Sequence, residues 1–301
     1  MSRQKTLIVI TGATASGKTS LAIDVARHLG CGIISADSRQ LFREIPIGTA
    51  APSAEEQAAV PHYFVGTLGL DDYYSAAMFE ADVMALLPSL WAENDYVVMA
   101  GGSMMYVDAV INGIDDIPTV SEENRRRAMQ IYESKGLQGL RLELLELDPV
   151  YYREVDLNNH RRLVHAIEII YQSGRRYSDL RSGTKKSRPF RILKFAIDIP
   201  RDELFERINR RVDTMVEQGL EQEVASVAAK RHLNSLNTVG YKEIFAMMDG
   251  VMTREEALLR IGKNTRVYAK KQLTWLRRDP SVIWIPSGQA GLKKIMQTLT
   301  E

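Results

Sequence analysis

Short apolar runs alternate with stretches of helical periodicity over the first hundred residues. The run at residues 6–10 ends at Thr11-Gly12, and Leu21, Val25 and Leu29 then recur at helical spacing. Further runs predict strands at residues 32–36, 62–67 and 96–100 and a helix at residues 75–91. Strands that alternate with helices predict a parallel sheet with both faces covered.

The pattern changes after Pro118. Residues 121–175 are strongly charged and have helical periodicity, and residues 183–191 form a polar, basic segment. Apolar runs at 192–199 and 282–285 again predict strands. We therefore expect an α/β core of residues 1–118 and 184–301, which an all-helical insertion of residues 119–183 interrupts.

Composition narrows the possibilities without naming a function. The 301 residues are 45% hydrophobic and 26% charged, as in an ordinary globular protein, and the net charge of +1 does not indicate a nucleic-acid partner. One cysteine, Cys31, excludes an internal disulfide and a cysteine-rich zinc finger, and we expect it in the core. No segment resembles a signal peptide or a membrane span, which predicts a cytoplasmic protein.

Residues 12–19 carry the first chemical signal. They read GATASGKT and fit G-x-x-x-x-G-K-[ST], between a strand and a helix as a P-loop requires. The pattern predicts a P-loop NTPase-like core whose loop amides and lysine bind a polyphosphate, with Mg²⁺ held by the terminal hydroxyl. The predicted diphosphate- or nucleotide-binding residues are Gly12, Ala13, Thr14, Ala15, Ser16, Gly17, Lys18 and Thr19.

A single acid follows a predicted strand at the same edge of the sheet. The strand at residues 96–100 ends in Gly101-Gly102-Ser103, without the carboxylate that P-loop ATPases use for their metal. The strand at residues 32–36 is followed by Asp37. One carboxylate beside a phosphate cradle suits a general base, and a helix N-cap or loop carboxylate is the structural alternative.

These residues resemble the tRNA dimethylallyltransferase family. The loop at residues 12–19 is similar to that family's GPTASGKT, with Ala13 in place of proline. Further matches follow in family order as far as about residue 278: Asp37-Ser38-Arg39-Gln40, Ile47-Gly48-Thr49-Ala50, Pro61-His62, Tyr74-Ser75-Ala76-Ala77, residues 113–118, residues 239–243, Thr265-Arg266 and residues 268–275. A P-loop is widespread, whereas this ordered set is specific.

The resemblance implies a prenyl transfer from dimethylallyl diphosphate to the adenosine immediately 3′ of the anticodon in tRNA. Asp37 would accept the proton of adenine N6, while Lys18, Thr19 and Mg²⁺ stabilise the departing diphosphate. The remaining expected contacts with tRNA come from Ser38, Arg39, Gln40, Ser103, His160 and Arg161. Ser103 replaces the threonine of the family's GGT, and Met104 replaces its next glycine, which would be strained if that position requires positive φ.

Two arginines compete for one role. The family places a catalytic arginine on the helix after Pro200, where Arg207 and Arg211 share a face one turn apart. The sequence leaves the choice open, and Glu203 offers Arg207 a salt bridge instead. We expect the enzyme to be a monomer that binds the anticodon stem-loop.

Basic residues are concentrated locally. Residues 160–194 hold ten lysines and arginines against two acids, an excess that can bind phosphates. The ten are Arg161, Arg162, Arg175, Arg176, Arg181, Lys185, Lys186, Arg188, Arg191 and Lys194. Thr253 and Glu256 predict a capping box at the start of the last long helix, on which Ile261 and Tyr268 are expected to face inward.

Three other functions stay open. An adenylate isopentenyltransferase would share the loop and Asp37, although a free nucleotide needs neither the insertion nor the basic helices. A P-loop small-molecule kinase would hydrolyse or transfer phosphate, which the missing strand-end acid disfavours. A non-catalytic RNA-binding module would leave the P-loop unexplained.

Overall fold

The computed structural model describes residues 4–181 and 183–300 and divides them into two compact units. Unit 1 contains the described residues up to Asn112 and from Arg188 onward, and unit 2 contains residues 113–187. This division lies a few residues outside the boundaries expected from the sequence. In unit 2 the two connecting segments pair with each other, because the Gly183 N–H donates to the Asp115 carboxylate at 3.2 Å.

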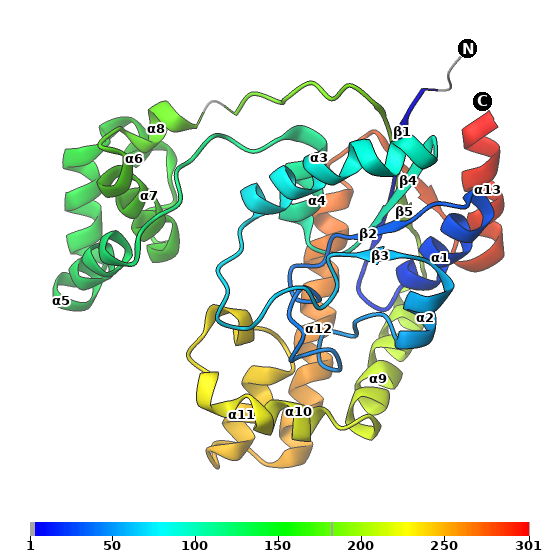
Figure 1. The fold of residues 1–301 in the computed structure, drawn as a ribbon. Coiled ribbons are helices and arrows are strands. Elements are labelled where there is room, and N and C mark those ends of the chain that lie inside the picture. The colour runs from blue at the N-terminus through cyan, green and yellow to red at the C-terminus, as the bar shows by residue number, and fades with distance from the viewer. Residues whose placement is uncertain (1–3, 182, 301) are drawn as a thin grey trace. The chain divides into compact units, whose positions relative to one another are not determined.

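Unit 1 is built on a six-stranded parallel sheet in the order β3-β2-β4-β1-β5-β6 (Figure 1). The strands are β1 Thr6–Gly12, β2 Ile33–Ser35, β3 His62–Tyr63, β4 Tyr96–Ala100, β5 Arg191–Ile197 and β6 Val282–Ile285. Strand β1 lies in the middle, where Thr6 aligns with Tyr96 of β4 and with Arg191 of β5. The sheet thus joins the two halves of the sequence that the insertion separates, and the expected P-loop NTPase-like parallel core is confirmed.

Helices surround this sheet (Figure 1). Those of unit 1 are α1 Lys18–Leu29, α2 Ala54–Ala59, α3 Ala76–Glu93, α4 Met104–Asn112, α9 Arg201–Glu217, α10 Leu220–Ser226, α11 Tyr241–Met248, α12 Arg254–Leu276 and α13 Gly288–Thr300, with 3-10 turns at Ala228–Lys230 and Asn234–Leu236. None of the helices in the described ranges has a stretch both long and apolar enough to cross a bilayer.

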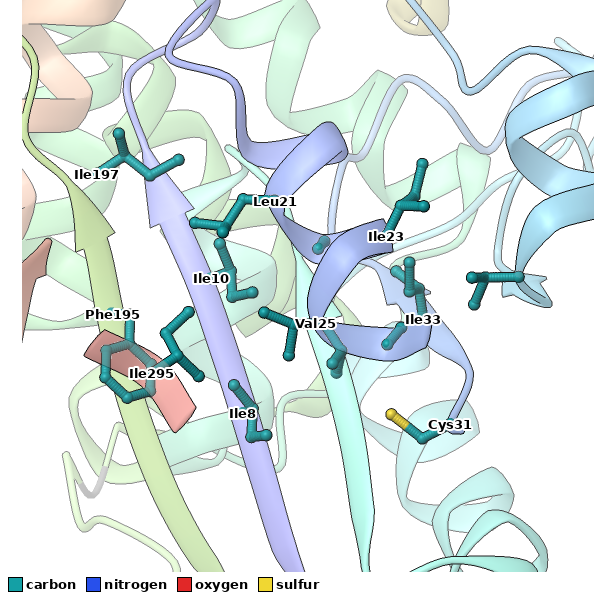
Figure 2. Close-up of a cluster of buried hydrophobic side chains, with 14 of the residues drawn as sticks. Ile8, Ile10, Leu21, Ile23, Val25, Cys31, Ile33, Phe195, Ile197 and Ile295 are labelled. Carbon is teal, nitrogen blue, oxygen red and sulfur yellow. The ribbon is translucent and has the colours of Figure 1, made fainter. Parts of the chain in front are cut away.

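Alternate residues of β1 build the core on one face of the sheet. Figure 2 shows Ile8 and Ile10 beside Leu21 and Val25 of α1, and all four are buried. Their helical spacing on α1 keeps one apolar stripe against the strands. Cys31 lies in the same cluster, as expected, and burial raises the pKa of its thiol to about 11.

The opposite face of β1 is also buried. Leu7 and Val9 point away from Ile8 and Ile10 because side chains alternate along a strand, and both are 0% exposed. A parallel sheet covered on both faces brings the carboxyl ends of its strands to one edge. At this edge open α/β sheets bind ligands.

The strand expected at residues 62–67 is shorter than its apolar pattern suggests. Only His62–Tyr63 pairs with β2, and Phe64 then adopts φ 65°, which ends the extended backbone. The Phe64 ring instead contacts Phe79 of α3 edge-on, with the ring centroids 5.2 Å apart. A side-chain contact with a helix therefore replaces the end of the predicted strand.

The regular elements described in unit 2 are all helices, which lie between two extended connecting segments. Its helices are α5 Glu122–Leu147, α6 Pro149–Glu154, α7 His160–Ser173 and α8 Tyr177–Leu180. Gly136 interrupts α5 with φ 63° and ψ −159°, a conformation that glycine adopts without strain. Buried Asp148 accepts hydrogen bonds from the Tyr151 N–H at 2.9 Å and the Ser178 N–H at 2.7 Å, so one carboxylate holds the starts of α6 and α8.

Helix α12 begins at the predicted capping box. Thr253 Oγ1 accepts from the Glu256 N–H at 3.2 Å, and the Glu256 carboxylate accepts from the Thr253 N–H at 2.9 Å. Ile261 is buried as expected, whereas Tyr268 is 39% exposed. The prediction that Tyr268 faces inward was wrong, since its ring lines an open cleft.

Candidate active site

A cleft of about 1200 Å³ opens at the carboxyl ends of β1, β2 and β4. All of its lining residues belong to unit 1. The lining comes from the P-loop, the segment at residues 37–40, the loop at residues 46–54, the turn at residues 100–103, the segment at residues 237–242, and helices α9 and α12. The sequence predicted the first, second and fourth of these at the sheet edge, and the resemblance placed an arginine of α9 at the diphosphate. The structure adds the lining from α12.

The P-loop has the backbone of an anion cradle. Gly12, Ala15 and Gly17 all have positive φ, at 146°, 64° and 94°. At Gly12 a Cβ would lie 2.9 Å from Ser16 Oγ, so the turn has no room for a side chain. Successive amides in such a turn point toward one concavity, which binds phosphate oxygens.

Lys18 lies at the start of α1, directly behind this turn. Its ammonium donates to the Ala13 carbonyl at 2.7 Å. The pKa of Lys18 is lowered to about 8, mainly by burial and also by nearby Arg211, and the charge of Asp37 opposes part of this lowering. The free protein therefore holds a cation that an anionic ligand would stabilise.

Asp37 follows β2 and lines the same cleft. Its Oδ1 accepts from the Arg39 N–H at 3.0 Å, which fixes the segment in an Asx turn. Because residues 38–41 form turns and not a helix, Asp37 is not a helix N-cap. Its charge raises the pKa of both Arg39 and Arg211, against the larger lowering by burial.

The turn after β4 comes very close to the segment that contains Asp37. A Cβ on Gly101 would lie 2.2 Å from the Ala36 carbonyl oxygen, so only glycine fits. Ser103 Oγ accepts from the Ser38 N–H at 2.8 Å and donates to Ser38 Oγ at 3.1 Å. Met104 begins α4 without positive φ and does not line the cleft, so the strain considered for it is absent.

Arg207 and Arg211 both reach the P-loop from α9. The Arg207 guanidinium donates to the Ser16 carbonyl at 3.4 Å and also binds the Glu203 carboxylate at 2.7 Å. Arg211 donates to Thr14 Oγ1 at 3.3 Å, and among the described residues no carboxylate lies within ion-pairing distance of it. Arg211 therefore differs from Arg207 in having no direct salt bridge among the described residues, and only the nearby charge of Asp37 favours its charged form.

Gln40 lines the cleft, but its amide is already bound. Its Oε1 accepts from Ser35 Oγ at 3.0 Å, and its Nε2 donates to the Ala50 carbonyl at 2.9 Å. These bonds tie the loop at residues 46–54 to the end of β2. Of the residues expected to contact tRNA, Ser38, Arg39 and Ser103 also line this cleft with Asp37.

Sequence reasoning missed the carboxylate that holds this loop from the other side. Glu223 of α10 accepts from the Ile47 N–H and the Gly48 N–H, both at 2.7 Å, and the Tyr241 hydroxyl donates to it at 2.5 Å. A Cβ on Gly48 would lie 2.5 Å from the Tyr241 hydroxyl. The matching Ile-Gly-Thr-Ala and Val-Gly-Tyr segments were the available signal, because they meet here.

His160 and Arg161 lie in unit 2, where they open α7. The His160 ring stacks on Tyr132 with the centroids 4.8 Å apart, while Arg161 is exposed. Arg162 is exposed as well. The start of α7 thus carries two exposed guanidinium groups.

Two members of the basic cluster have structural partners instead. Arg188 is buried against Glu80 at 2.7 Å and donates to the Val110 carbonyl at 2.8 Å. Lys194 pairs with Asp279 beside β5. The prediction was that the local excess of basic residues can bind phosphates, and these two residues do not contribute to it, because a charged side chain that is largely buried needs a partner of its own.

The cleft suits a magnesium ion only if the ligand brings most of the oxygen donors. Within residues 4–181 and 183–300, no group of three or more His, Cys, Asp and Glu side chains could hold a metal. Mg²⁺ commonly keeps several waters and binds through substrate phosphates with one or two protein oxygens. The Thr19 hydroxyl, on the cleft wall next to Lys18, fits as such an oxygen donor.

Comparison with known proteins gives a consistent result. Residues 40–279 match the family described as IPP transferase. The chain is 53% identical over 284 residues to tRNA dimethylallyltransferase 1 of Phocaeicola vulgatus, covering 94% of this chain and 95% of that one. It is 41% identical over 285 residues to tRNA dimethylallyltransferase of Cytophaga hutchinsonii, covering 95% and 94%.

Solved structures share the fold. A tRNA isopentenylpyrophosphate transferase from Bacillus halodurans aligns with a TM-score of 0.72 and 33% identity, covering 99% of this chain and 96% of that one. A eukaryotic dimethylallyltransferase acting on tRNA aligns with a TM-score of 0.83 over 98% of this chain and 78% of that one. At 23% identity, that second likeness concerns the fold alone.

Proposed function

The chain belongs to the IPP transferase family, and from this we propose that it acts as a tRNA dimethylallyltransferase. It transfers the dimethylallyl group of dimethylallyl diphosphate to N6 of the adenosine immediately 3′ of the anticodon in tRNA, and releases diphosphate. One observation carries the proposal: the P-loop cradle and Asp37 line the same cleft, so a leaving group and a base can act on one substrate pair.

The reaction exchanges one bond for another. The adenine N6 lone pair forms a bond to C1 of the dimethylallyl group, while the C1–O bond breaks and its electron pair leaves with the diphosphate. The Asp37 carboxylate takes the N6 proton. Lys18 and the loop amides stabilise the negative charge on the departing oxygens.

Arg211 is the arginine that we assign to the diphosphate. Its guanidinium donates to Thr14 Oγ1 of the loop, and within the described chain it forms no direct salt bridge, although the nearby charge of Asp37 raises its pKa. Arg207 holds the loop through the Ser16 carbonyl while Glu203 balances its charge. Mg²⁺, held by Thr19 and the substrate phosphates, would supply further charge stabilisation of the leaving group.

The tRNA is proposed to present its adenine to the cleft by unstacking it, since a base within a stack cannot bring N6 to a half-buried carboxylate inside a cleft. Ser38, Arg39 and Ser103 are the proposed contacts with this base and its neighbours. Exposed Arg161, beside His160 on α7, is the proposed contact with the phosphates of the anticodon stem-loop. We propose that the enzyme is a cytoplasmic monomer.

Product analysis tests the proposal against its rivals. The protein is incubated with dimethylallyl diphosphate, Mg²⁺ and either unmodified tRNA or AMP, and the nucleosides are analysed by mass spectrometry. We expect prenylated adenosine from tRNA only. Prenyl-AMP would indicate an adenylate isopentenyltransferase, phosphate transfer a kinase, and the absence of any product a binding module; each would overturn the proposal.

A further inference from the structure

Gln272 of α12 is a buried amide with partners on two neighbouring loops of the cleft wall, which follow β1 and β4. Its side chain is 2% exposed. The Oε1 atom accepts from the Thr14 N–H of the P-loop at 2.8 Å, and the Nε2 atom donates to the Gly102 carbonyl at 2.8 Å. One planar group therefore spans the loop that receives the diphosphate and the turn that follows β4.

The Gly102 end of this bridge leads on to the base. Tyr268 also donates to the Gly102 carbonyl, at 3.2 Å, and a Cβ on Gly102 would lie 2.4 Å from Gln272 Nε2. The next residue, Ser103, donates its N–H to the Ala36 carbonyl at 3.1 Å and accepts from the Ser38 N–H through Oγ. These bonds continue from Thr14 to the two residues that flank Asp37.

We infer that Gln272 is a positioning residue that fixes the separation between the diphosphate cradle and the Asp37 carboxylate. This inference rests on the proposed function, in which Asp37 and the leaving group act on the same reaction centre. Only a side chain with an acceptor and a donor at one tip can satisfy an N–H on one loop and a carbonyl on the other. Glutamate would set a carboxylate against the Gly102 carbonyl, and methionine would fill the same volume without either bond.

The expected consequence is a loss of turnover and not of substrate binding. Each loop keeps its own phosphate or base contacts without Gln272, but their spacing is no longer held. A misplacement of about 1 Å can reduce a rate on the order of 100-fold. We expect Gln272→Met to lower kcat by roughly 10- to 100-fold and to change the Kd of inorganic diphosphate by less than about 3-fold.

A double-mutant cycle with Ser103→Ala separates positioning from stability. Ser103→Ala removes the Oγ bond to Ser38 and so breaks the same chain further along. If Gln272 acts through that chain, the double variant will lose little more kcat than the worse single variant. Additive losses, or a kcat loss that equals the loss of folded protein measured by thermal unfolding, would overturn the inference.

Hydrogen exchange provides a test that does not depend on activity. Gln272→Met should increase hydrogen exchange at the Ser38 amide, although Gln272 does not contact Ser38. The matched substitution Gln297→Met, at an exposed position of α13, should leave both kcat and the exchange at Ser38 unchanged. If Gln272→Met does not fold, Gln272→Asn, which keeps both polar groups but shortens their reach, replaces it. A wild-type protein without prenyl transfer would refute the proposed function, and unchanged Ser38 exchange would refute the inference.

Discussion

At the scale of single residues, the charged form of Lys18 destabilises the folded protein as long as no ligand is bound. Its pKa is lowered from 10.5 to about 8, so the unfolded chain binds more protons between these values and stability rises with pH across that window. At neutral pH the unfavourable contribution is fully present. We expect Lys18→Met to raise the Tm of the ligand-free protein by ~2–4 °C and to weaken diphosphate binding on the order of 10- to 100-fold.

The same shift predicts proton uptake on binding. An anion in the cradle should raise the pKa of Lys18, so diphosphate binding at about pH 8.5 should draw a proton from the buffer. Calorimetry in buffers of different ionisation enthalpy measures this uptake. Lys18→Arg, which is charged throughout, is the control, and equal uptake by both proteins would contradict the prediction.

Asp37 is expected to act in the chemical step. Asp37→Asn keeps the volume and the bond to the Arg39 amide but cannot accept the N6 proton, so kcat should fall roughly 10²- to 10⁴-fold while tRNA affinity stays within a few-fold. Single-turnover prenyl transfer and filter binding measure the two effects. Asp202→Asn, on the exposed first turn of α9, serves as the control. A collapse of tRNA binding with unchanged turnover of bound tRNA would assign Asp37 to RNA orientation.

At the scale of elements, the capping box at the start of α12 stabilises a helix whose later residues line the cleft. Thr253→Ala leaves the Glu256 N–H without its acceptor and should lower stability by ~1 kcal/mol. Thr274→Ala, on an exposed position of the same helix, should change it by less than ~0.5 kcal/mol. Urea unfolding of the two variants tests this, and equal destabilisation would show that the cap does not stabilise α12.

Element patterns were readable from the sequence wherever one face was apolar. The continuous apolar run of β1 and the stripe of Leu21 and Val25 on α1 sufficed to predict the strand, the helix and the loop between them. Phe64 was misjudged because its backbone leaves the strand at positive φ and its ring packs on Phe79 of the next helix, α3. Gln272 and Glu223 could not be assigned, because their partners lie on segments that only the tertiary fold brings together.

At the scale of the whole molecule, the net charge does not distinguish exposed basic residues, which can bind RNA, from buried ones, which form structural ion pairs. Arg161→Ala should weaken tRNA binding and reduce the slope of log K against log salt by about 1, with stability unchanged. Arg188→Met should instead cost about 3 kcal/mol or more, since it removes the guanidinium from buried Glu80, and leave the salt slope of the folded protein as it is. Salt titrations and thermal unfolding distinguish the two variants, and exchanged outcomes would contradict the assignment.

The two units have separate hydrophobic cores, which predicts that unit 1 folds alone. Replacing residues 113–187 with a short Gly-Ser linker should give a protein that unfolds cooperatively and binds inorganic diphosphate with wild-type affinity, but binds tRNA at least about 10-fold more weakly. Loss of cooperative unfolding would show that unit 1 depends on unit 2. Unchanged tRNA affinity would place the RNA contacts elsewhere.

Arg188 brings the two ends of the insertion to one place, because it returns the chain to unit 1 beside the Val110 carbonyl, two residues before the exit at Asn112. A segment inserted between these two positions can therefore change length without shifting the register of the sheet. Evolution can therefore change unit 2, which carries the proposed contact of Arg161 with tRNA, at a different rate from unit 1, which carries the cleft. Relatives that modify different sets of tRNAs should therefore differ mainly in the sequence between these two positions, by the gain, loss or exchange of whole helices.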